Sequence, residues 1–392
     1  MSEIYILDGA RTPFGTFGGT LKDVDPTTLG ITASKEAIKR SGVEAEEIDM
    51  AVVGNVIHGT RNAAYVGRHI ALGAGVPIAT PALTVNRLCG SGLQAVVSLG
   101  QSIRLGESEA GLAVGTENMS MAPYMMRGAR FGTGMKSPDL DDMLWASLTD
   151  EYSGIGMGMT AENLAIQYNI TREEQDQFAL ESQLRASAAR REGKFTEEIV
   201  PVEIKTKKGT TIVDQDEHIR ENTTLEALAK LRPSFKKDGT VTAGNASGIN
   251  DGAGAIVLAS EGFVQKKNAK PLARIISWGV AGVPPEIMGI GPVPAIQMAL
   301  KRANMSIQDV NLFEINEAFA SQYLAVEKEL GLNRSITNVN GGAIALGHPV
   351  GGSGVRILYS LILELKRRNQ KYGVASLCIG GGQGIAAVVE VF

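Results

Sequence analysis

Residues 85–100 read VNRLCGSGLQAVVSLG, where Cys89 is followed at once by Gly-Ser-Gly and then by a helical pattern. Apolar residues recur on one side of that helix, at Leu93, Val96, Val97 and Ile103. The segment at 110–118, AGLAVGTEN, then has the character of a buried strand. Strands that alternate with helices form βαβ units, so this stretch predicts a mostly parallel sheet covered by helices.

The same order of loop, helix and strand recurs near the C-terminus. Gly-Ser-Gly at 352–354 opens an apolar helix, and the strand-like segment GVASLCIG follows at 373–380. Short glycine matches arise by chance, but the shared order of the elements adds weight to them. The sequence therefore predicts two similar α/β halves.

Start and stop signals locate further elements. Asp25, Pro26 and Gly42 cap and close a helix at 25–42, and Thr171 with Glu174 forms a capping box for a helix at 171–193. Strands are expected at 3–10, 48–57, 252–260, 372–384 and 386–392, and further helices at 294–305 and 354–369.

The chain changes character near Met119. Residues 119–145 are rich in Met, Gly and Arg without periodicity, and charged, turn-rich sequence continues to about residue 248. We therefore predict an insertion at 119–249. The N-terminal half then comprises 1–118 with 250–270, and the C-terminal half comprises 271–392.

Composition indicates a soluble globular protein of more than one domain. The chain has 392 residues, of which 44% are hydrophobic and 20% charged, with a net charge of −4. This charge gives no general attraction to nucleic acid, and we expect neither a membrane span nor a signal peptide. The two cysteines are then expected to be free thiols in a reducing, cytoplasmic setting.

Cys89 and His348 are the first candidates for chemistry. A thiol at a helix N-terminus is expected to shift towards thiolate, although a free cysteine can also be a small buried hydrophobe. His348 lies in the glycine-rich loop NGGAIALGHPVGGSG, and a histidine close to a cysteine commonly activates the thiol. His58, His69 and His218 have no catalytic or metal-ligand spacing, and no metal site is expected.

Two further residues are candidates, namely Cys378 at a strand end and Asn316 at the start of an apolar helix. Cys378 precedes three glycines, whose backbone N–H groups could point at a developing oxyanion. A phosphate-binding loop is the rival interpretation, but the stretch lacks a Walker lysine and a G-x-G-x-x-G arrangement. Asn316, in NEAFA, could either cap the following helix or orient a water molecule at a carbonyl.

These motifs together resemble the thiolase family closely. NRLCGSGLQA, TAGNASGINDGA, NEAFA, GGAIALGHPVGGSG and CIGGGQG match its signature stretches, and the resemblance covers essentially the whole chain. It implies a thiolase-like fold, in which two βαβ-type halves form a layered α/β/α/β/α core with an inserted loop domain. It also implies a homo-oligomer, either a dimer or a tetramer.

The resemblance implies a role for each reacting group. Cys89 would carry the acyl group, His348 would activate it, and Cys378 would be the acid/base at the α-carbon of the substrate. Asn316, through a water, and His348 would form one oxyanion site, and the backbone N–H groups of Cys89 and Gly380 the other. The enzyme would condense two acetyl-CoA molecules to acetoacetyl-CoA and CoA by ping-pong Claisen chemistry, or run the reverse thiolysis.

Coenzyme A thioesters would then be substrates, and no permanently bound cofactor is expected. The resemblance places Arg220 near the nucleotide and Ser247 on the pantetheine, whose slot would be walled by Leu148, Met157, Phe235, Ala243, Ala246 and Phe319. One departure concerns Gly156. Biosynthetic members often carry a histidine there, so the glycine leaves room for longer acyl groups.

Several alternatives stay open. Within the family the rival is a degradative 3-ketoacyl-CoA thiolase that acts on longer chains. Outside it, Cys89, His348 and Asn316 would also suit a papain-like hydrolase, which has no use for Cys378. A carrier-protein condensing enzyme would carry a second histidine in place of Cys378, and a non-catalytic CoA-binding scaffold would not need every reacting group.

Overall fold

One large sheet runs through the protein, which we describe from a computed structural model that covers residues 2–135, 137–207 and 209–392. Its strand order is β14-β15-β16-β13-β1-β12-β5-β3-β4, and the short β2 (Gly15–Thr16) pairs with β12. The N-terminal half supplies β1 (Ile4–Arg11), β3 (Met50–Gly54), β4 (Ala82–Val85), β5 (Ala110–Asn118) and β12 (Asn250–Ser260). The C-terminal half supplies β13 (Ala273–Gly282), β14 (Leu312–Ile315), β15 (Tyr372–Ile379) and β16 (Gln383–Val391).

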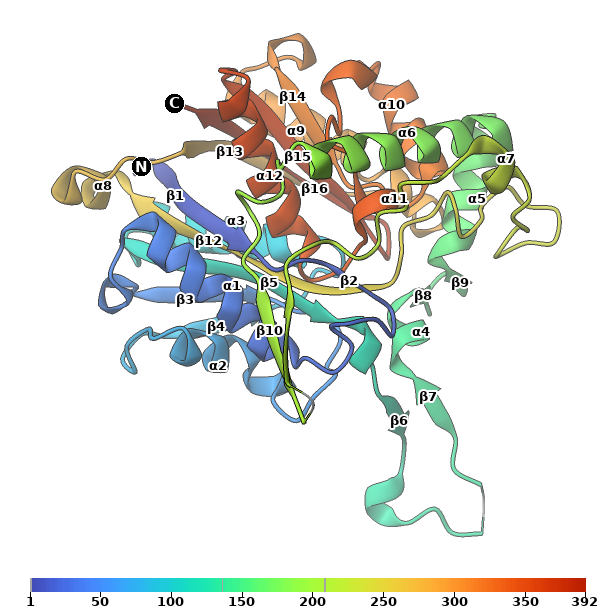
Figure 1. Ribbon diagram of the computed structural model, residues 1–392, viewed down its shortest axis with the longest axis horizontal. Helices are drawn as coiled ribbons and strands as arrows, with labels where there is room; N and C mark the ends of the chain where they lie inside the picture. Colours follow the sequence, from blue (N-terminus) through green and yellow to red (C-terminus); the bar gives the residue numbers. More distant parts are fainter. Residues whose placement is uncertain (1, 136, 208) are drawn as a thin grey trace.

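Two central helices separate the strands of the two halves. These are α3 (Ser91–Leu105) and α12 (Ser353–Arg367), whose apolar side chains form one buried cluster with strands from both halves, including Ile256 and Leu377. Figure 1 shows the N-terminal half in blue and cyan below the orange and red C-terminal half. The two sets of strands join only briefly, where Ile4 to Ile6 of β1 pair with β13.

Outer helices cover the other faces of both sets of strands. On the N-terminal half, α1 (Pro26–Ser41) and α2 (Val66–Gly73) share a buried cluster with β3, β5 and β12. On the C-terminal half, α9 (Pro292–Ala303) and α10 (Ala320–Leu330) share one with β14 and β16. The predicted layered α/β/α/β/α core is therefore confirmed.

The predicted capping signals are also confirmed. The Asp25 side chain accepts a hydrogen bond from the Thr27 backbone N–H, and Gly42 closes α1 with a φ of 69°. In α6 (Arg172–Arg191), the hydroxyl of Thr171 accepts from the Glu174 N–H while the Glu174 carboxylate accepts from the Thr171 N–H. These helix ends were readable because each depends on neighbouring residues alone.

The prediction of a mostly parallel sheet is wrong. Parallel pairing is found for β3 with β4, β3 with β5, and β14 with β15, whereas β12 and β16 pair antiparallel with their neighbours. The reason lies in the connections. β16 follows β15 through a glycine turn instead of a crossover helix, and β12 returns from the insertion, so neither is constrained to run parallel.

The insertion between β5 and β12 forms the green part of Figure 1. It contains α4 (Met143–Ser147), α5 (Met157–Gln167), α6, α7 (Leu225–Ala229) and the short strands β8 (Thr149–Asp150) and β9 (Ile155–Gly156). α5 and α6 pack on α10, where the Phe178 and Tyr323 rings stack with centroids 4.3 Å apart. The insertion is thereby attached to the outer face of the C-terminal half.

Two hairpins extend from the insertion. β10 (Val202–Thr206) and β11 (Gly209–Val213) lie against the N-terminal half, whereas β6 (Tyr124–Met126), β7 (Leu140–Asp142) and the described residues at 127–135 and 137–139 form an arm that projects from the body (Figure 1). The arm exposes large apolar side chains, namely Tyr124, Phe131, Met135 and Leu140.

None of the helices in the described parts of the chain combines the length and hydropathy needed to cross a bilayer.

The N-terminal ends of α3 and α12 meet backbone to backbone. A Cβ atom on Gly92 would lie 2.8 Å from the Gly351 carbonyl oxygen, and one on Gly354 would lie 2.2 Å from the Leu93 backbone nitrogen. Side-chain atoms cannot occupy these distances without moving the main chain. The repeated Gly-Ser-Gly therefore permits the close contact that brings both helix ends to one place.

Gly354→Ala is expected to lower the free energy of unfolding by about 1–3 kcal/mol, because the added methyl group overpacks a rigid backbone contact. Urea denaturation followed by tryptophan fluorescence measures the change. Gly262→Ala in α8 (Glu261–Lys267) is the control, since its Cβ would have only Ser260 Oγ nearby, at 3.9 Å. If the two variants are equally stable, close helix contact does not explain Gly354.

Candidate active site

Cys89 lies on a tight turn between β4 and α3. The residue before it, Leu88, has a φ of 45°, which is an unfavourable conformation for a branched side chain. Hydrogen bonds hold this turn: the Leu88 N–H donates to Asn86 Oδ1 at 2.9 Å, and Ser91 Oγ donates to the Leu88 carbonyl at 2.7 Å. The sulfur is thus presented from a locally strained backbone at the start of a helix.

The ionisation of Cys89 differs from the sequence-based expectation. The pKa of its thiol is raised to about 11, chiefly by burial and to a smaller extent by the charge of Glu117, against hydrogen bonds from the backbone N–H groups of Gly380 and Cys89 itself, which lower it. The prediction of a shift towards thiolate is therefore wrong, because the loss of hydration outweighs the helix terminus. The resting group at neutral pH is a thiol, which needs a base.

His348 is the imidazole that the structure brings to this place. It is buried, its Nδ1 lies 2.6 Å from Ser353 Oγ, and its Nε2 lies 3.3 Å from Asn316 Nδ2. Ser353 Oγ donates its own proton to the Pro349 carbonyl at 3.0 Å, so it accepts from Nδ1–H. This assigns the proton to Nδ1 and leaves the lone pair of Nε2 available as a base.

Burial also sets the charge of this imidazole. Burial, together with the positive charge of Arg356, lowers the pKa of His348 to about 3. His348 is therefore neutral at physiological pH. Asn250 Oδ1 accepts a hydrogen bond from the His348 backbone N–H at 2.9 Å, which fixes the loop that carries the ring.

Asn316 follows β14 and is buried beside His348. The alternative that its amide caps the next helix is wrong, because α10 begins at Ala320 after Phe319 and no side chain caps it. Its Oδ1 atom is buried and has no hydrogen-bond partner among the described residues. A buried amide oxygen without a partner is costly, so it is a candidate contact for a ligand or a water molecule.

Cys378 is the last residue but one of β15 and is fully buried. Its apolar surroundings include Met288, Ala318, Met157 and Phe319. These four residues also line a neighbouring cavity. Burial raises the pKa of the Cys378 thiol well above its usual value, and a charge on Cys89 raises it further. The two thiols therefore interact electrostatically, and neither favours ionisation at rest.

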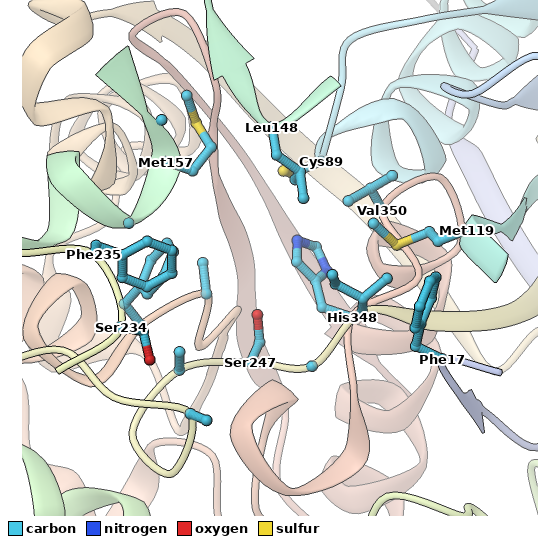
Figure 2. Close-up of a pocket in the computed structure, with 18 of the residues that line it drawn as sticks. Phe17, Cys89, Met119, Leu148, Met157, Ser234, Phe235, Ser247, His348 and Val350 are labelled. Carbon is cyan, nitrogen blue, oxygen red and sulfur yellow. The ribbon is translucent and has the colours of Figure 1, made fainter. Parts of the chain in front are cut away.

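A cavity of about 520 Å³ opens onto Cys89 and His348. Cys89 and His348 line it, between Met157 and Phe235 on one side and Met119 and Phe17 on the other (Figure 2). Every residue predicted to hold coenzyme A lines it as well, namely Leu148, Met157, Arg220, Phe235, Ala243, Ala246, Ser247 and Phe319. Cys378, Asn316 and Gly380 do not line the cavity but adjoin residues that do.

Comparison with known proteins agrees with this arrangement. Residues 4–262 match the family described as thiolase, N-terminal domain, and residues 269–391 match thiolase, C-terminal domain. The chain belongs to the thiolase family. The mitochondrial 3-ketoacyl-CoA thiolase of Homo sapiens is 55% identical over 388 residues, covering 99% of this chain and 98% of that protein.

Two further relatives of this thiolase are informative. The acetyl-CoA acetyltransferase of Syntrophomonas wolfei is 48% identical over 393 residues, which cover 99% of each chain. A crystal structure of the human mitochondrial 3-ketoacyl-CoA thiolase in complex with CoA has a TM-score of 0.97 and 53% identity, and covers 100% of this chain and 98% of that one. The predicted family and fold are thus confirmed, and this thiolase is an acyltransferase of CoA thioesters.

One wall of the cavity is attached to the loop that carries Asn316. The Ser247 backbone N–H donates to the Ala318 carbonyl at 2.9 Å, and Ala246 pairs with Phe319 across an isolated β-bridge. The Phe235 and Phe319 rings meet edge to face with centroids 6.1 Å apart. This wall of the cavity is therefore attached to the C-terminal half.

Sequence reasoning missed Glu117, which holds two loops next to the site of this thiolase. Its carboxylate is buried and accepts hydrogen bonds from the backbone N–H groups of Val56, Ile57 and Gly351 at 3.0–3.1 Å, and from the Asn55 amide at 3.1 Å. It thus connects the loop after β3 to the loop that follows His348. A buried acid at the end of an apolar strand was the available signal.

Sequence reasoning also assigned no task to His218, which lines the cavity next to Arg220. Its ring lies on the backbone of Gly248, where a Cβ atom would be 2.4 Å from His218 Cε1. Burial, together with the charge of Arg220, lowers the pKa of His218 to about 4, so the ring is neutral at pH 7. No spacing in the sequence brings residue 218 next to residue 248.

Proposed function

We propose that this thiolase transfers acyl groups through a covalent intermediate on Cys89. The observation that carries the proposal is the neutral His348 ring, whose unprotonated Nε2 lies beside the Asn316 amide and faces the site from the half opposite to that of the thiol. His348 takes the proton of Cys89 as the sulfur attacks a thioester or ketone carbonyl. The N–H groups of Cys89 and Gly380, which hydrogen-bond the sulfur at rest, support an oxyanion site there.

Cys378 supplies the acid/base step in this proposal. In thiolysis, Cys89 adds to the 3-oxo carbon of the substrate, the C2–C3 bond breaks, and Cys378 gives its proton to the acetyl-CoA carbanion. Coenzyme A then takes the acyl group from Cys89 through its own thiol, whose proton returns to the enzyme. In synthesis, the coenzyme A thiolate released when the first acetyl-CoA acylates Cys89 takes the proton of Cys378. The Cys378 thiolate removes the α-proton of a second acetyl-CoA, the carbanion attacks the acetyl group on Cys89, and the departing Cys89 thiolate takes back the proton held by His348. In this proposal, Asn316, through a water molecule, and His348 stabilise the oxyanion of that carbanion; the buried, unpartnered Oδ1 of Asn316 supports this role.

Cys378→Ala is expected to retain acylation of Cys89 and to lose carbon–carbon bond formation by about 10²–10⁴-fold. The first half-reaction only moves a thioester, whereas the second requires a base at the α-carbon. Intact mass after exposure to acetyl-CoA and the rate of acetoacetyl-CoA formation measure the two steps. Cys89→Ala should lose both, and condensation at the wild-type rate by folded Cys378→Ala would contradict the mechanism.

We propose further that the enzyme cleaves 3-oxoacyl-CoA substrates longer than acetoacetyl-CoA. The observation that carries this is Gly156 at the cavity wall, where a side chain would meet nothing closer than the Leu148 carbonyl oxygen at 3.7 Å. The apolar side chains of Phe17, Met119 and Val350 flank Cys89 and His348 beyond the predicted pantetheine slot (Figure 2). The 55% identical human relative named 3-ketoacyl-CoA thiolase supports the same assignment.

The second candidate is the acetyl-CoA acetyltransferase favoured by the sequence. The 48% identical relative of that name in Syntrophomonas wolfei supports it. Both candidates use the same reacting groups, so they differ only in the acyl chain that the cavity accepts.

A chain-length series separates the two candidates. We expect kcat/KM for thiolysis to be at least as high with eight-carbon as with four-carbon 3-oxoacyl-CoA. Gly156→His should lower the ratio of the eight-carbon to the four-carbon value by about tenfold or more, since its ring occupies open space, and Gly156→Ala should change it little. A wild-type enzyme that cleaves acetoacetyl-CoA alone would exclude the longer-chain assignment.

We also propose that the protein is a homo-oligomer. Support comes from the arm, which exposes the large side chains of Phe131 and Met135, and from β4, which ends the sheet with Leu83 half exposed. Exposed apolar surface of this kind commonly marks an interface. Sedimentation velocity at micromolar concentration is expected to give a dimer or a tetramer, and Phe131→Ser with Met135→Ser should reduce a tetramer to a smaller species. A wild-type monomer would exclude the proposal.

A further inference from the structure

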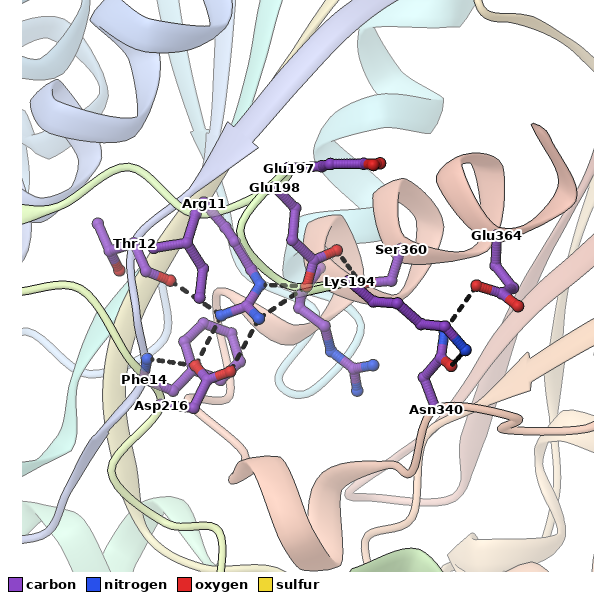
Figure 3. Close-up of polar contacts among 12 residues, drawn as sticks. Arg11, Thr12, Phe14, Lys194, Glu197, Glu198, Asp216, Asn340, Ser360 and Glu364 are labelled. Carbon is purple, nitrogen blue, oxygen red and sulfur yellow. Dashed lines mark hydrogen bonds and ion pairs between the residues drawn. The ribbon is translucent and has the colours of Figure 1, made fainter. Parts of the chain in front are cut away.

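Arg11, at the end of β1, is among the largest fully buried side chains of the protein. Its Nε donates to Glu198 Oε1 at 2.8 Å, and its Nη1 and Nη2 donate to the two carboxylate oxygens of Asp216 at 2.7 and 2.9 Å (Figure 3). All three side chains are at most 2% exposed. One guanidinium therefore holds two buried carboxylates that would otherwise repel each other.

The remaining oxygens of this cluster reach other parts of the protein. Glu198 Oε2 accepts from Ser360 Oγ of α12 at 2.6 Å, and Asp216 Oδ1 also accepts from the Phe14 backbone N–H at 2.9 Å. Arg11 lies in the N-terminal half, Glu198 and Asp216 in the insertion, and Ser360 in the C-terminal half. The cluster thus joins all three parts.

The backbone of Arg11 holds the same region. Its N–H donates to the Glu198 carbonyl at 2.8 Å, and its carbonyl accepts from the Val200 N–H at 2.7 Å. The chain leaves this point after Glu198, forms the β10–β11 hairpin and returns at Asp216. Both ends of the hairpin are therefore attached to one residue.

Only the second attachment leads into the cavity. The segment at 216–220 follows directly, and its His218 and Arg220 line the cavity, whereas Glu198 and the residues at 199–200 do not. In the same segment, Glu217 Oε2 accepts from the Thr16 backbone N–H at 2.8 Å, and this contact is exposed to solvent. Asp216 is thus one buried attachment of this cavity wall, beside Gln183 Oε1, which accepts from the Arg220 backbone N–H at 2.8 Å.

The two walls of the cavity are attached to different halves. Ser247 is hydrogen-bonded to the loop that carries Asn316, and His218 lies against the neighbouring Gly248. We propose that Arg11 is a positioning residue for coenzyme A binding, which acts through Asp216 to hold His218 and Arg220 at the correct separation from Ser247. The inference rests on the proposed placement of coenzyme A in this cavity.

The test compares variants of the two carboxylates that share the guanidinium. Asp216→Asn keeps an oxygen for the Phe14 N–H but loses the paired charge, and Glu198→Gln removes the matching charge at the hairpin end that does not enter the cavity. Arg11→Lys keeps the positive charge but cannot form the same fork of bonds. Coenzyme A affinity by titration calorimetry, KM and kcat for thiolysis, and alkylation of Cys89 by iodoacetamide are measured for each.

Arg11→Lys and Asp216→Asn are expected to raise the Kd and the KM of coenzyme A by about tenfold to a hundredfold, with kcat changed less. Cys89 alkylation should stay within about twofold of wild type, because the nucleophile is attached elsewhere. Glu198→Gln should lower the unfolding temperature as Asp216→Asn does, but leave the KM unchanged. The double variant Arg11→Lys with Asp216→Asn should have a Kd for coenzyme A no higher than that of the weaker-binding single variant, since both substitutions act on one contact.

Three results would overturn the inference: an unchanged Kd in folded Asp216→Asn, an equal rise in KM for Glu198→Gln, or additive effects in the double variant. Each would mean that the cluster only stabilises the fold. The substrate proposal fails by a different result, because a wild-type enzyme without activity on longer chains would still give a Kd for coenzyme A. Calorimetry therefore decides the role of Arg11 independently.

Discussion

The contact between the N-terminal ends of α3 and α12 determines where the chemistry of this thiolase can occur. Helix backbones approach this closely only if glycines stand on both sides of the contact, as Gly92 and Gly354 do. The consequence is geometric, since Cys89 immediately precedes one helix end and the His348 loop leads into the other. Each half alone would present a thiol or an imidazole without its partner.

Burial then decides how those groups behave. The Cys89 thiol and the His348 imidazole are both held neutral, because desolvation raises the pKa of the first and lowers that of the second. A neutral pair stores no separated charge in an apolar cavity, and charge develops only as a substrate carbonyl is attacked. In the proposed mechanism, the N–H groups of Cys89 and Gly380, which lower the pKa of the Cys89 thiol at rest, would also stabilise that charge.

The sequence predicted those features that depend on neighbouring residues or on family motifs. Such signals predicted the caps at Asp25 and Thr171 and the layered halves. They also predicted that Cys89, His348 and the residues expected to hold coenzyme A lie around one cavity. It failed where the outcome depends on three-dimensional surroundings. The direction of the Cys89 pKa shift depends on hydration lost to distant side chains, and the place of His218 depends on its contact with Gly248. Strand direction was misjudged because β12 and β16 lack crossover helices.

Two serines show how one short motif serves two tasks. Ser91 and Ser353 occupy the same position in the two Gly-Ser-Gly turns, and each hydroxyl donates to a carbonyl three or four residues earlier. The oxygen lone pairs of the two hydroxyls accept from different groups. Ser91 Oγ accepts from the Arg87 N–H and stiffens the turn before the thiol, whereas Ser353 Oγ accepts from the imidazole and selects its tautomer. The same motif thus restrains main chain in one half and controls the position of a proton in the other, so a repeated motif is a poor guide to equivalent function.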